Sequence, residues 1–149
     1  MKILILNGPN LNLIGKREPE IYGTQSLDEY LETVKKRFPD CSIDTFQSNH
    51  EGVLIDKLQE AMDKYDAVVM NPGGYAHTSI ALADAIKAIG IPVVEVHISN
   101  IYEREEYRHH SYTAEAAAHS IVGHGLEGYA EAISILKAFS FRRKVTAEK

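Results

Sequence analysis

The sequence predicts an α/β fold in which a parallel β-sheet is covered by helices on both faces. Two observations support this prediction. The runs at 2–7, 67–71 and 91–97 are almost wholly apolar, which is typical of strands buried on both faces. Segments with apolar residues at helical spacing separate the strands, so strand and helix alternate as they do in βαβ units.

The expected elements can be placed in order by apolar periodicity, capping residues and helix breakers. The expected strands lie at 2–7, 41–48, 67–71 and 91–97, with a weak fifth strand at 120–122, and an irregular stretch at 8–23 follows the first strand. The expected helices lie between Ser26 and Pro39, at 51–65, from a cap at Thr78 or Ser79 to Gly90, and from 126 to about 143, with a short exposed helix at 103–110. In the helix at 51–65, the residues at helical spacing are Val53, Leu54, Leu58, Ala61 and Met62.

Five strands of this length favour the smaller doubly wound arrangement, a flavodoxin-like sheet with strand order 2-1-3-4-5. The chain shows no internal repeat or linker, so we expect one domain over 1–149, with a tail from about 144. In such sheets ligands bind beyond the carboxyl ends of the strands, where the strand order reverses. The segments after Leu6, Met70 and Val96 are therefore expected to form the site.

Composition excludes several classes of protein. The chain has 149 residues, 44% hydrophobic and 25% charged, with a formal net charge of −5, which argues against a nucleic-acid or anionic-membrane surface. One cysteine, Cys41, rules out an intramolecular disulfide. A strand starting at Lys2 leaves no room for a signal peptide, and no apolar run is long enough to span a membrane. We expect a cytoplasmic protein.

The irregular stretch 8–23 is long for a connection in a compact domain, which favours a functional lid over an ordinary ordered loop. It carries Arg17 near Tyr22, and a guanidinium beside a phenol favours the phenolate. A tyrosine base needs about 4 kcal/mol from its neighbours to ionise at neutral pH. Three glycines, Gly8, Gly15 and Gly23, are candidate hinges. We expect this lid to be mobile without ligand and ordered with it.

Glu95 and His97 stand two residues apart in a strand, so both side chains point to one face, about 6–7 Å apart at the backbone. A carboxylate in this position fixes the imidazole tautomer and stabilises its protonated form, which makes His97 a candidate proton donor. The alternative is a buried structural pair. Similarly, His77 either hydrogen-bonds a ligand or completes a turn.

Other motifs point away from nucleotide, metal and acyl chemistry. Gly73-Gly74 offers backbone amides to an anion but lacks the spacing and lysine of a Walker loop. The GxGxxG run at 123–128 lies in the last βα unit, so we interpret it as close packing of the final helix. Adjacent His109 and His110 diverge by about 100° on a helix, and neither metal-ligand clusters nor a nucleophile elbow is found. The alternative function is a non-catalytic flavodoxin-like module that binds FMN or a small anionic metabolite.

The third expected helix is apolar around most of its circumference, which predicts that its outer face meets another subunit. Asp84 lies in this helix. It is either a partly exposed acid or a polar residue that reaches across the subunit interface.

Several stretches, in order along almost the whole chain, resemble the type II 3-dehydroquinate dehydratases, also called type II dehydroquinases. These stretches are Asn7–Leu11, Gly15–Pro19 with Tyr22–Gly23, Gln47–Gly52, Asn71–Gly74 with His77–Ser79, and Glu95–Asn100 with Arg104–Glu105 and His110–Ser111. The resemblance implies a flavodoxin-like fold and a homo-dodecamer built as a tetramer of trimers. The reaction that it implies is the reversible dehydration of 3-dehydroquinate to 3-dehydroshikimate, an anti elimination through an enolate. This reaction belongs to the shikimate pathway of aromatic amino acid biosynthesis. It implies no cofactor and no metal.

The resemblance also assigns roles by motif. Tyr22 as phenolate takes the C2 proton, and Arg17 lowers its pKa and holds the lid. Asn10 positions a water on the enolate oxygen. His97, oriented by Glu95, protonates the leaving C1 hydroxyl. The residues implied to bind substrate are Asn71, His77, Ile98, Ser99 and Arg108, with Asp84 from the neighbouring subunit.

Two residues depart from the family pattern. Pro72 stands where a small residue such as Ala is expected, which removes one backbone donor beside Asn71. His109 stands where Arg is common. Neither change touches the expected acid–base pair, so they bear on substrate affinity and local charge.

Overall fold

Five parallel strands form one sheet in the order β2-β1-β3-β4-β5, which confirms the predicted topology. The structure, a computed structural model, describes residues 1–16, 20 and 24–147, the last seven as helical backbone only. The strands are β1 (Lys2–Asn7), β2 (Ser42–Gln47), β3 (Ala67–Asn71), β4 (Val93–His97) and β5 (His119–Val122). In the register of the sheet, Ile5 of β1 lies opposite Thr45 of β2 and Val69 of β3.

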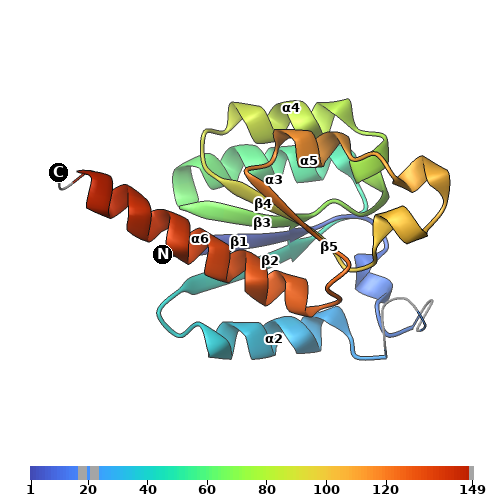
Figure 1. Ribbon diagram of the computed structural model, residues 1–149, viewed down its shortest axis with the longest axis horizontal. Coiled ribbons are helices and arrows are strands. Elements are labelled where there is room, and N and C mark those ends of the chain that lie inside the picture. Colours follow the sequence, from blue (N-terminus) through green and yellow to red (C-terminus); the bar gives the residue numbers. More distant parts are fainter. Residues whose placement is uncertain (17–19, 21–23, 148–149) are drawn as a thin grey trace.

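Helices cover both faces of the sheet (Figure 1). The helices α2 (Leu27–Arg37) and α6 (Glu127–Ala147) pack on one face. The helices α3 (Glu51–Lys64), α4 (Ile80–Ala88) and α5 (Tyr112–Ala116) lie over the other. Short 3-10 turns, η1 (Leu11–Leu13), η2 (Gly73–His77), η3 (Ile101–Glu103) and η4 (Glu106–Arg108), stand among the connections. None of the helices in the described residues has the length and apolar character to cross a membrane.

The sheet divides the core into two apolar clusters because neighbouring residues of a strand point to opposite faces. Ile3, Ile5, Val69 and Val94 pack with α2 and α6, whereas Leu4, Leu6, Val68 and Met70 pack with α3 and α4. The strands of this sheet are therefore apolar on both sides, as the uninterrupted apolar runs predicted.

Local signals at the helix ends are confirmed. The Ser26 hydroxyl accepts a hydrogen bond from the Glu29 amide at 3.2 Å, as the capping box predicted. Ser79, rather than Thr78, caps α4 by accepting from the Leu82 amide at 2.9 Å. A Cβ on Gly128 would lie 3.1 Å from Val96 Cγ1, so the GxGxxG run does serve the close packing of α6 on β4.

The structure differs from the expected elements, or adds to them, in four details. The segment 103–110 is not one helix, because Glu103 ends the turn η3 and 106–108 form the separate turn η4. The helix α5 was not expected at all. The last helix continues to Ala147 instead of ending near 143, since 129–147 contains neither glycine nor proline to stop it. On α3, Val53 and Met62 are exposed.

Candidate active site

The carboxyl ends of β1, β3 and β4 border an open cleft that holds about 680 Å³ of space not filled by atoms. This is the edge where the strand order reverses, so the cleft lies where the topology predicted it. The structure brings the following predicted site residues into its lining: Asn10, Asn71, His77, His97, Ile98, Ser99 and Arg108.

The Glu95–His97 pair forms as the spacing predicted. Nε2 of His97 lies 2.8 Å from Oε2 of Glu95, and the two side chains are 6% and 1% exposed. An ionised carboxylate only accepts hydrogen bonds, so Nε2 carries a proton and Nδ1 is the nitrogen left for a ligand. Glu95 does not line the cleft; it lies behind His97 and orients the imidazole.

Two hydroxyls that the sequence analysis did not assign to the site also bind Glu95. Ser111 donates to Oε2 at 2.9 Å, and Thr113 donates to Oε1. The His110-Ser111 motif marked the neighbourhood of Ser111, but nothing in the sequence indicated a role for Thr113.

His77 is held beside the Glu95–His97 pair. Its ring stacks on that of His97, with centroids 5.9 Å apart and planes at 29°. Nδ1 of His77 lies 2.8 Å from the carbonyl oxygen of His110, so Nδ1 donates and Nε2 is the remaining acceptor. Burial lowers the pKa of His77, which favours this neutral form. His77 thus both completes the turn and lines the cleft.

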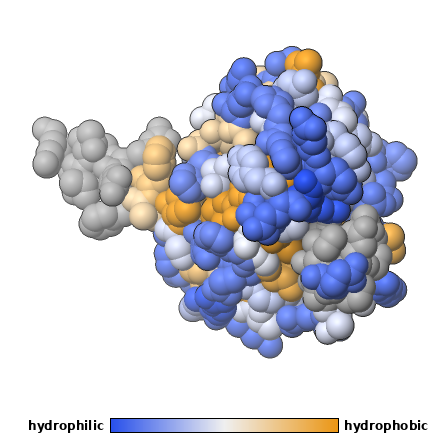
Figure 2. All heavy atoms as spheres, turned by 45° about the vertical axis from the view of Figure 1, so that its right-hand side comes forward, coloured by the Kyte–Doolittle hydropathy of each residue, from blue (hydrophilic) through white to orange (hydrophobic). Residues whose placement is uncertain are grey.

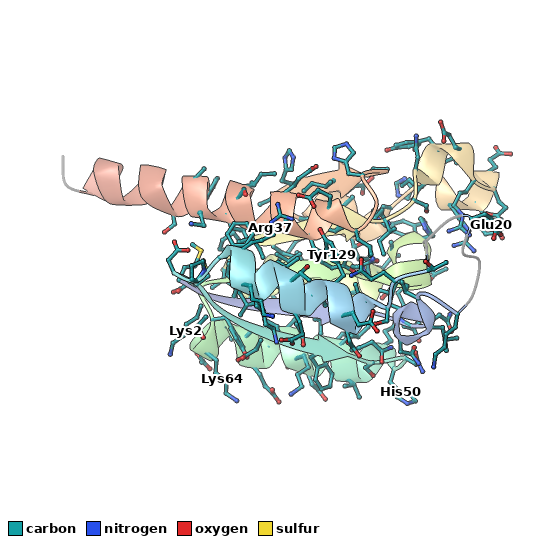
Figure 3. All side chains as sticks on the ribbon, turned by 90° about the horizontal axis from the view of Figure 1, so that it is seen from below. Lys2, Glu20, Arg37, His50, Lys64 and Tyr129 are labelled. Carbon is teal, nitrogen blue, oxygen red and sulfur yellow. The ribbon has the colours of Figure 1, made fainter. Side chains whose placement is uncertain are left out.

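Asn71 is fixed by a buried hydrogen-bond chain that joins two strands to α6. Its side-chain amide donates to the Tyr129 hydroxyl at 3.1 Å, and this hydroxyl donates to Oδ1 of Asn7 at 2.6 Å. Figure 3 shows Tyr129 between α6 and the sheet. The amide of Gly73 donates to Oδ1 of Asn71 at 3.1 Å, so one donor of the expected Gly73-Gly74 anion cradle is already in use.

Two arginines give the cleft a positive wall. Arg104 and Arg108 both line it. Nε of Arg108 lies 2.8 Å from Oε2 of Glu105, which orients the guanidinium, and Nη1 of Arg104 lies 3.4 Å from the Ser99 hydroxyl. Guanidinium groups at this position suit a carboxylate or another anionic group.

The loop after β1 begins with a close backbone approach. A Cβ on Gly8 would lie 2.4 Å from the carbonyl oxygen of Pro72, so this position admits only glycine. Asn10 then adopts a left-handed conformation, with φ of 70°, and its amide donates to Oδ1 of Asn49 at 3.0 Å. This turn holds Asn10 at the cleft.

Among the described residues, one further predicted site residue, Asp84, is not in this cleft. Tyr22 and Arg17 lie outside the described residues. Asp84 is exposed on α4 and does not line the cleft of its own chain. Among the described residues, there is no group of three or more His, Cys, Asp or Glu side chains that could hold a metal ion.

Comparison with known proteins gives consistent matches over most of the chain. Residues 1–137 match the family model described as dehydroquinase class II. A 3-dehydroquinate dehydratase of Clostridium botulinum strain Hall is 55% identical over 136 residues, 90% of this chain and 92% of the relative. Catabolic 3-dehydroquinase 2 of Aspergillus flavus is 52% identical over 134 residues, 88% of this chain and 89% of the relative.

The solved structures agree with the sequence matches. The type II dehydroquinase of Butyrivibrio crossotus superposes with a TM-score of 0.90 at 45% identity, covering 92% of this chain and 97% of that one. The likeness therefore extends over the fold as a whole and includes the strand ends that border the cleft.

Proposed function

The chain belongs to the dehydroquinase class II family, and on this premise we propose that its cleft removes water from 3-dehydroquinate to give 3-dehydroshikimate. The observation that carries the proposal is the buried Glu95–His97 pair at the rim of a cleft with arginines in its wall. A proton donor beside an anion-binding wall suits elimination of a hydroxyl from a carboxylate-bearing substrate. The reaction makes this chain a hydro-lyase.

The first proposed step is proton abstraction at C2. Tyr22, kept as phenolate by Arg17, takes the proton, and the electron pair moves onto the carbonyl oxygen to give an enolate. A water positioned by Asn10 stabilises the enolate oxygen. The described part of this arrangement is Asn10 at the cleft, held by its left-handed turn.

The second proposed step is loss of the C1 hydroxyl. The enolate collapses to the conjugated enone while Nδ1 of His97 gives its proton to the leaving oxygen, so water departs. Glu95 stabilises the imidazolium before transfer and keeps Nε2 protonated throughout. Base and acid act from opposite faces of the substrate ring, which gives an anti elimination. The two steps transfer one proton from C2 to Tyr22 and one from His97 to the leaving oxygen, with no net oxidation or reduction, so they need no redox cofactor.

The remaining cleft residues bind substrate in this proposal. Asn71 and His77 face the substrate hydroxyls, and both are held by hydrogen bonds that leave further polar atoms for a ligand. The backbone amides of Ile98 and Ser99, together with Arg108, bind the carboxylate; all three residues line the cleft. Pro72 and His109 do not line it.

We further propose that the enzyme works as a cytoplasmic homo-dodecamer, a tetramer of trimers, in the shikimate pathway. Support for assembly comes from the exposed side of α4, where Ile80 is 61% exposed and Asp84 is exposed without lining its own cleft. Analytical ultracentrifugation tests the subunit number. Growth of an aromatic auxotroph that lacks dehydroquinase activity tests the pathway, and cell fractionation tests the location.

A near-ultraviolet assay tests the reaction itself. The product is a conjugated enone and the substrate is not, so turnover of pure 3-dehydroquinate raises the absorbance. No rise would refute the proposal, and a yellow protein that binds FMN without turnover would support the non-catalytic alternative.

The Tyr22→Phe variant tests the base. We expect it to keep the fold, measured by circular dichroism, and to lose most activity, because no phenolate is left to take the C2 proton. A Tyr22→Phe variant with near wild-type turnover would remove Tyr22 from this role.

A further inference from the structure

The carboxylate of Glu95 accepts more hydrogen bonds than orientation of His97 requires. Besides Nε2 of His97 at 2.8 Å, Oε2 accepts from Ser111 at 2.9 Å, and Oε1 accepts from Thr113. The two hydroxyls lie 3.2 Å apart. Both residues come from the start of α5, which packs against α4. All four side chains are buried.

The additional hydrogen bonds to Glu95 stabilise its charge if His97 changes its own charge during the reaction, as the proposed function requires. Before proton transfer the imidazolium compensates the buried carboxylate. After transfer His97 is neutral, and Glu95, only 1% exposed, has lost its counter-charge. A buried carboxylate without compensation takes up a proton, unless hydrogen bonds to its charged form prevent this.

We propose that Thr113, together with Ser111, is a positioning residue that keeps Glu95 ionised and oriented in both protonation states of His97. Two neutral hydroxyls do this without a second positive charge, which would compete with the imidazolium. The carboxylate then stays a constant acceptor for Nε2, so the transferable proton remains on Nδ1, the nitrogen left for the substrate. The proposal rests on the proposed function, because that function assigns the proton transfer to His97.

Thr113 is the better probe of the two hydroxyls. Ser111 also caps α5, since its hydroxyl accepts from the Ala114 amide at 3.1 Å, and its removal would weaken the helix as well. The Thr113 hydroxyl donates to Glu95, and the Ser111 hydroxyl lies 3.2 Å from it. Thr113 is 0% exposed, so valine can replace it with almost the same shape and without admitting water.

The charged groups around Glu95 and His97 are held by contacts other than the Thr113 hydroxyl. His97 adjoins Glu95 on β4, His77 of η2 stacks on His97, and the guanidinium of Arg108 in η4 acts electrostatically on His77. Arg104 lines the same cleft. Thr113→Val leaves all of these in place, so a change in the titration of His97 would report the lost hydroxyl.

The expected result has a defined sign. Loss of a hydrogen bond to Glu95 destabilises the carboxylate most when His97 is neutral, so Thr113→Val raises the pKa of His97. A hydrogen bond to a charged group corresponds to a shift of about one unit. The basic limb of the kcat profile should therefore move up by about one pH unit, while the acidic limb, assigned to Tyr22, stays. A more tightly held proton makes a weaker acid, so we expect kcat to fall about tenfold with KM little changed.

The experiment compares Thr113→Val with Thr113→Ser, which restores the hydroxyl, and with Thr33→Val on α2, where the threonine hydroxyl donates to the Tyr30 carbonyl of its own helix. We expect the Ser variant and the Thr33 control to follow wild type. In parallel, NMR titration of His97 in substrate-free protein measures its pKa without turnover. This readout separates failure of the inference from failure of the proposed function.

Two outcomes overturn the inference. One is a Thr113→Val protein whose basic limb and His97 titration both match wild type, which would leave Thr113 a packing residue. The other is equal loss of activity in the Val and Ser variants, since the serine keeps the donor. If Thr113→Val does not fold, the His97 titration of Ser111→Ala decides, because it also removes a hydroxyl donor to Glu95, and an unshifted titration counts against the proposal.

Discussion

At the scale of single residues, buried polar groups are fixed by partners that are distant in sequence. Tyr129 is the clearest case, because its fully buried hydroxyl donates to Asn7 and accepts from Asn71. Tyr129 does not line the cleft, whereas Asn71 does. The hydroxyl therefore acts on a ligand only through the orientation of the Asn71 amide.

Tyr129→Phe tests this orientation. The ring still fills the core, but the side chains of Asn7 and Asn71 each lose a buried partner, which should lower the free energy of unfolding by about 1–3 kcal/mol. Because Asn71 is proposed to bind substrate rather than to transfer a proton, we expect KM to rise about tenfold, equivalent to about 1.4 kcal/mol, with a smaller change in kcat. Urea unfolding and steady-state kinetics measure the two effects.

Tyr65→Phe is the matched control. The Tyr65 hydroxyl also donates to a side chain, Asp44, at 2.6 Å, and this hydrogen bond raises the pKa of Tyr65 to about 12. Tyr65 follows α3 at the opposite end of the sheet, so its loss should leave KM unchanged. If both variants raised KM alike, a general loosening of the fold rather than Asn71 would be responsible.

The distance in sequence between hydrogen-bond partners explains how much of the site could be predicted. Glu95 and His97 stand two apart in one strand, and the period of a strand alone places them together. Ser111 and Thr113 reach Glu95 from a different element, 16 and 18 residues along the chain, so no local period reveals them. Tyr129 lies 58 residues from Asn71 and looks like an ordinary core tyrosine in the sequence.

At the scale of elements, α2 and α6 are joined at the surface as well as through the core. Both oxygens of Glu127, at the start of α6, accept from the Arg37 guanidinium, at 2.7 and 2.9 Å, and Oε2 also accepts from Tyr30 at 2.8 Å. Figure 3 shows Arg37 of α2 close to the ribbon of α6. The hydrogen bonds from Arg37 and Tyr30 lower the pKa of Glu127 to about 2.

The stability from this link should depend on pH in one direction. Because the folded protein lowers the pKa of Glu127, the stabilisation is complete above the unfolded value of about 4.3 and is lost as the pH falls towards 2. The side chains are about half exposed, so solvent screening limits the contribution to below about 1 kcal/mol. We expect Glu127→Gln to lower the unfolding free energy at pH 6 and to match wild type near pH 2.

Glu32→Gln provides the comparison for this prediction. Glu32 pairs with Lys35 within α2 at 3.0 Å, so its removal breaks an ion pair without separating two helices. We expect Glu32→Gln to lower the unfolding free energy at pH 6 by less than Glu127→Gln does. Equal effects of the two variants at pH 6 would show that the bidentate link between α2 and α6 adds nothing beyond an ordinary surface pair.

Long elements were predictable and short ones were not. The strands and the helices α2, α3 and α4 carry several periods of apolar residues or a capping residue, and each was placed within a few positions. The helix α5 has only five residues, less than two turns, so no period can establish itself. The charged stretch after Glu103 suits a helix by composition, yet it forms only the 3-10 turn η4, whose last residue, Arg108, lines the cleft.

At the scale of the whole molecule, parts of the chain have no cover within the monomer. The C-terminal part of α6 extends past the sheet, and no other element of the described residues lies beside its ribbon (Figure 1). Figure 2 shows apolar side chains gathered where this helix leaves the body. Helices are marginally stable alone, and their packing supplies most of their stability. The exposed side of α4, with Ile80, likewise suits contact with another copy of the chain.

If the copies share their sites, two inactive variants should restore each other. Asp84 is exposed on α4 and does not line its own cleft, so in the proposed assembly it completes the site of a neighbour. Tyr22→Phe lacks the base, and Asp84→Ala lacks the residue given to the adjacent site. In mixed oligomers, a cleft from an Asp84→Ala subunit beside a Tyr22→Phe subunit contains both intact groups.

Co-expression of the two variants, separately tagged and purified through both tags, should therefore recover part of the wild-type turnover, whereas each variant alone stays inactive. The reason is geometric, because each active site then draws Tyr22 from one chain and Asp84 from another. If Asp84 served its own chain, each site in the mixed oligomer would lack one group, and co-expression would recover nothing. Full turnover by a monomeric wild-type protein in the ultracentrifuge would equally contradict site sharing, since one chain would then suffice.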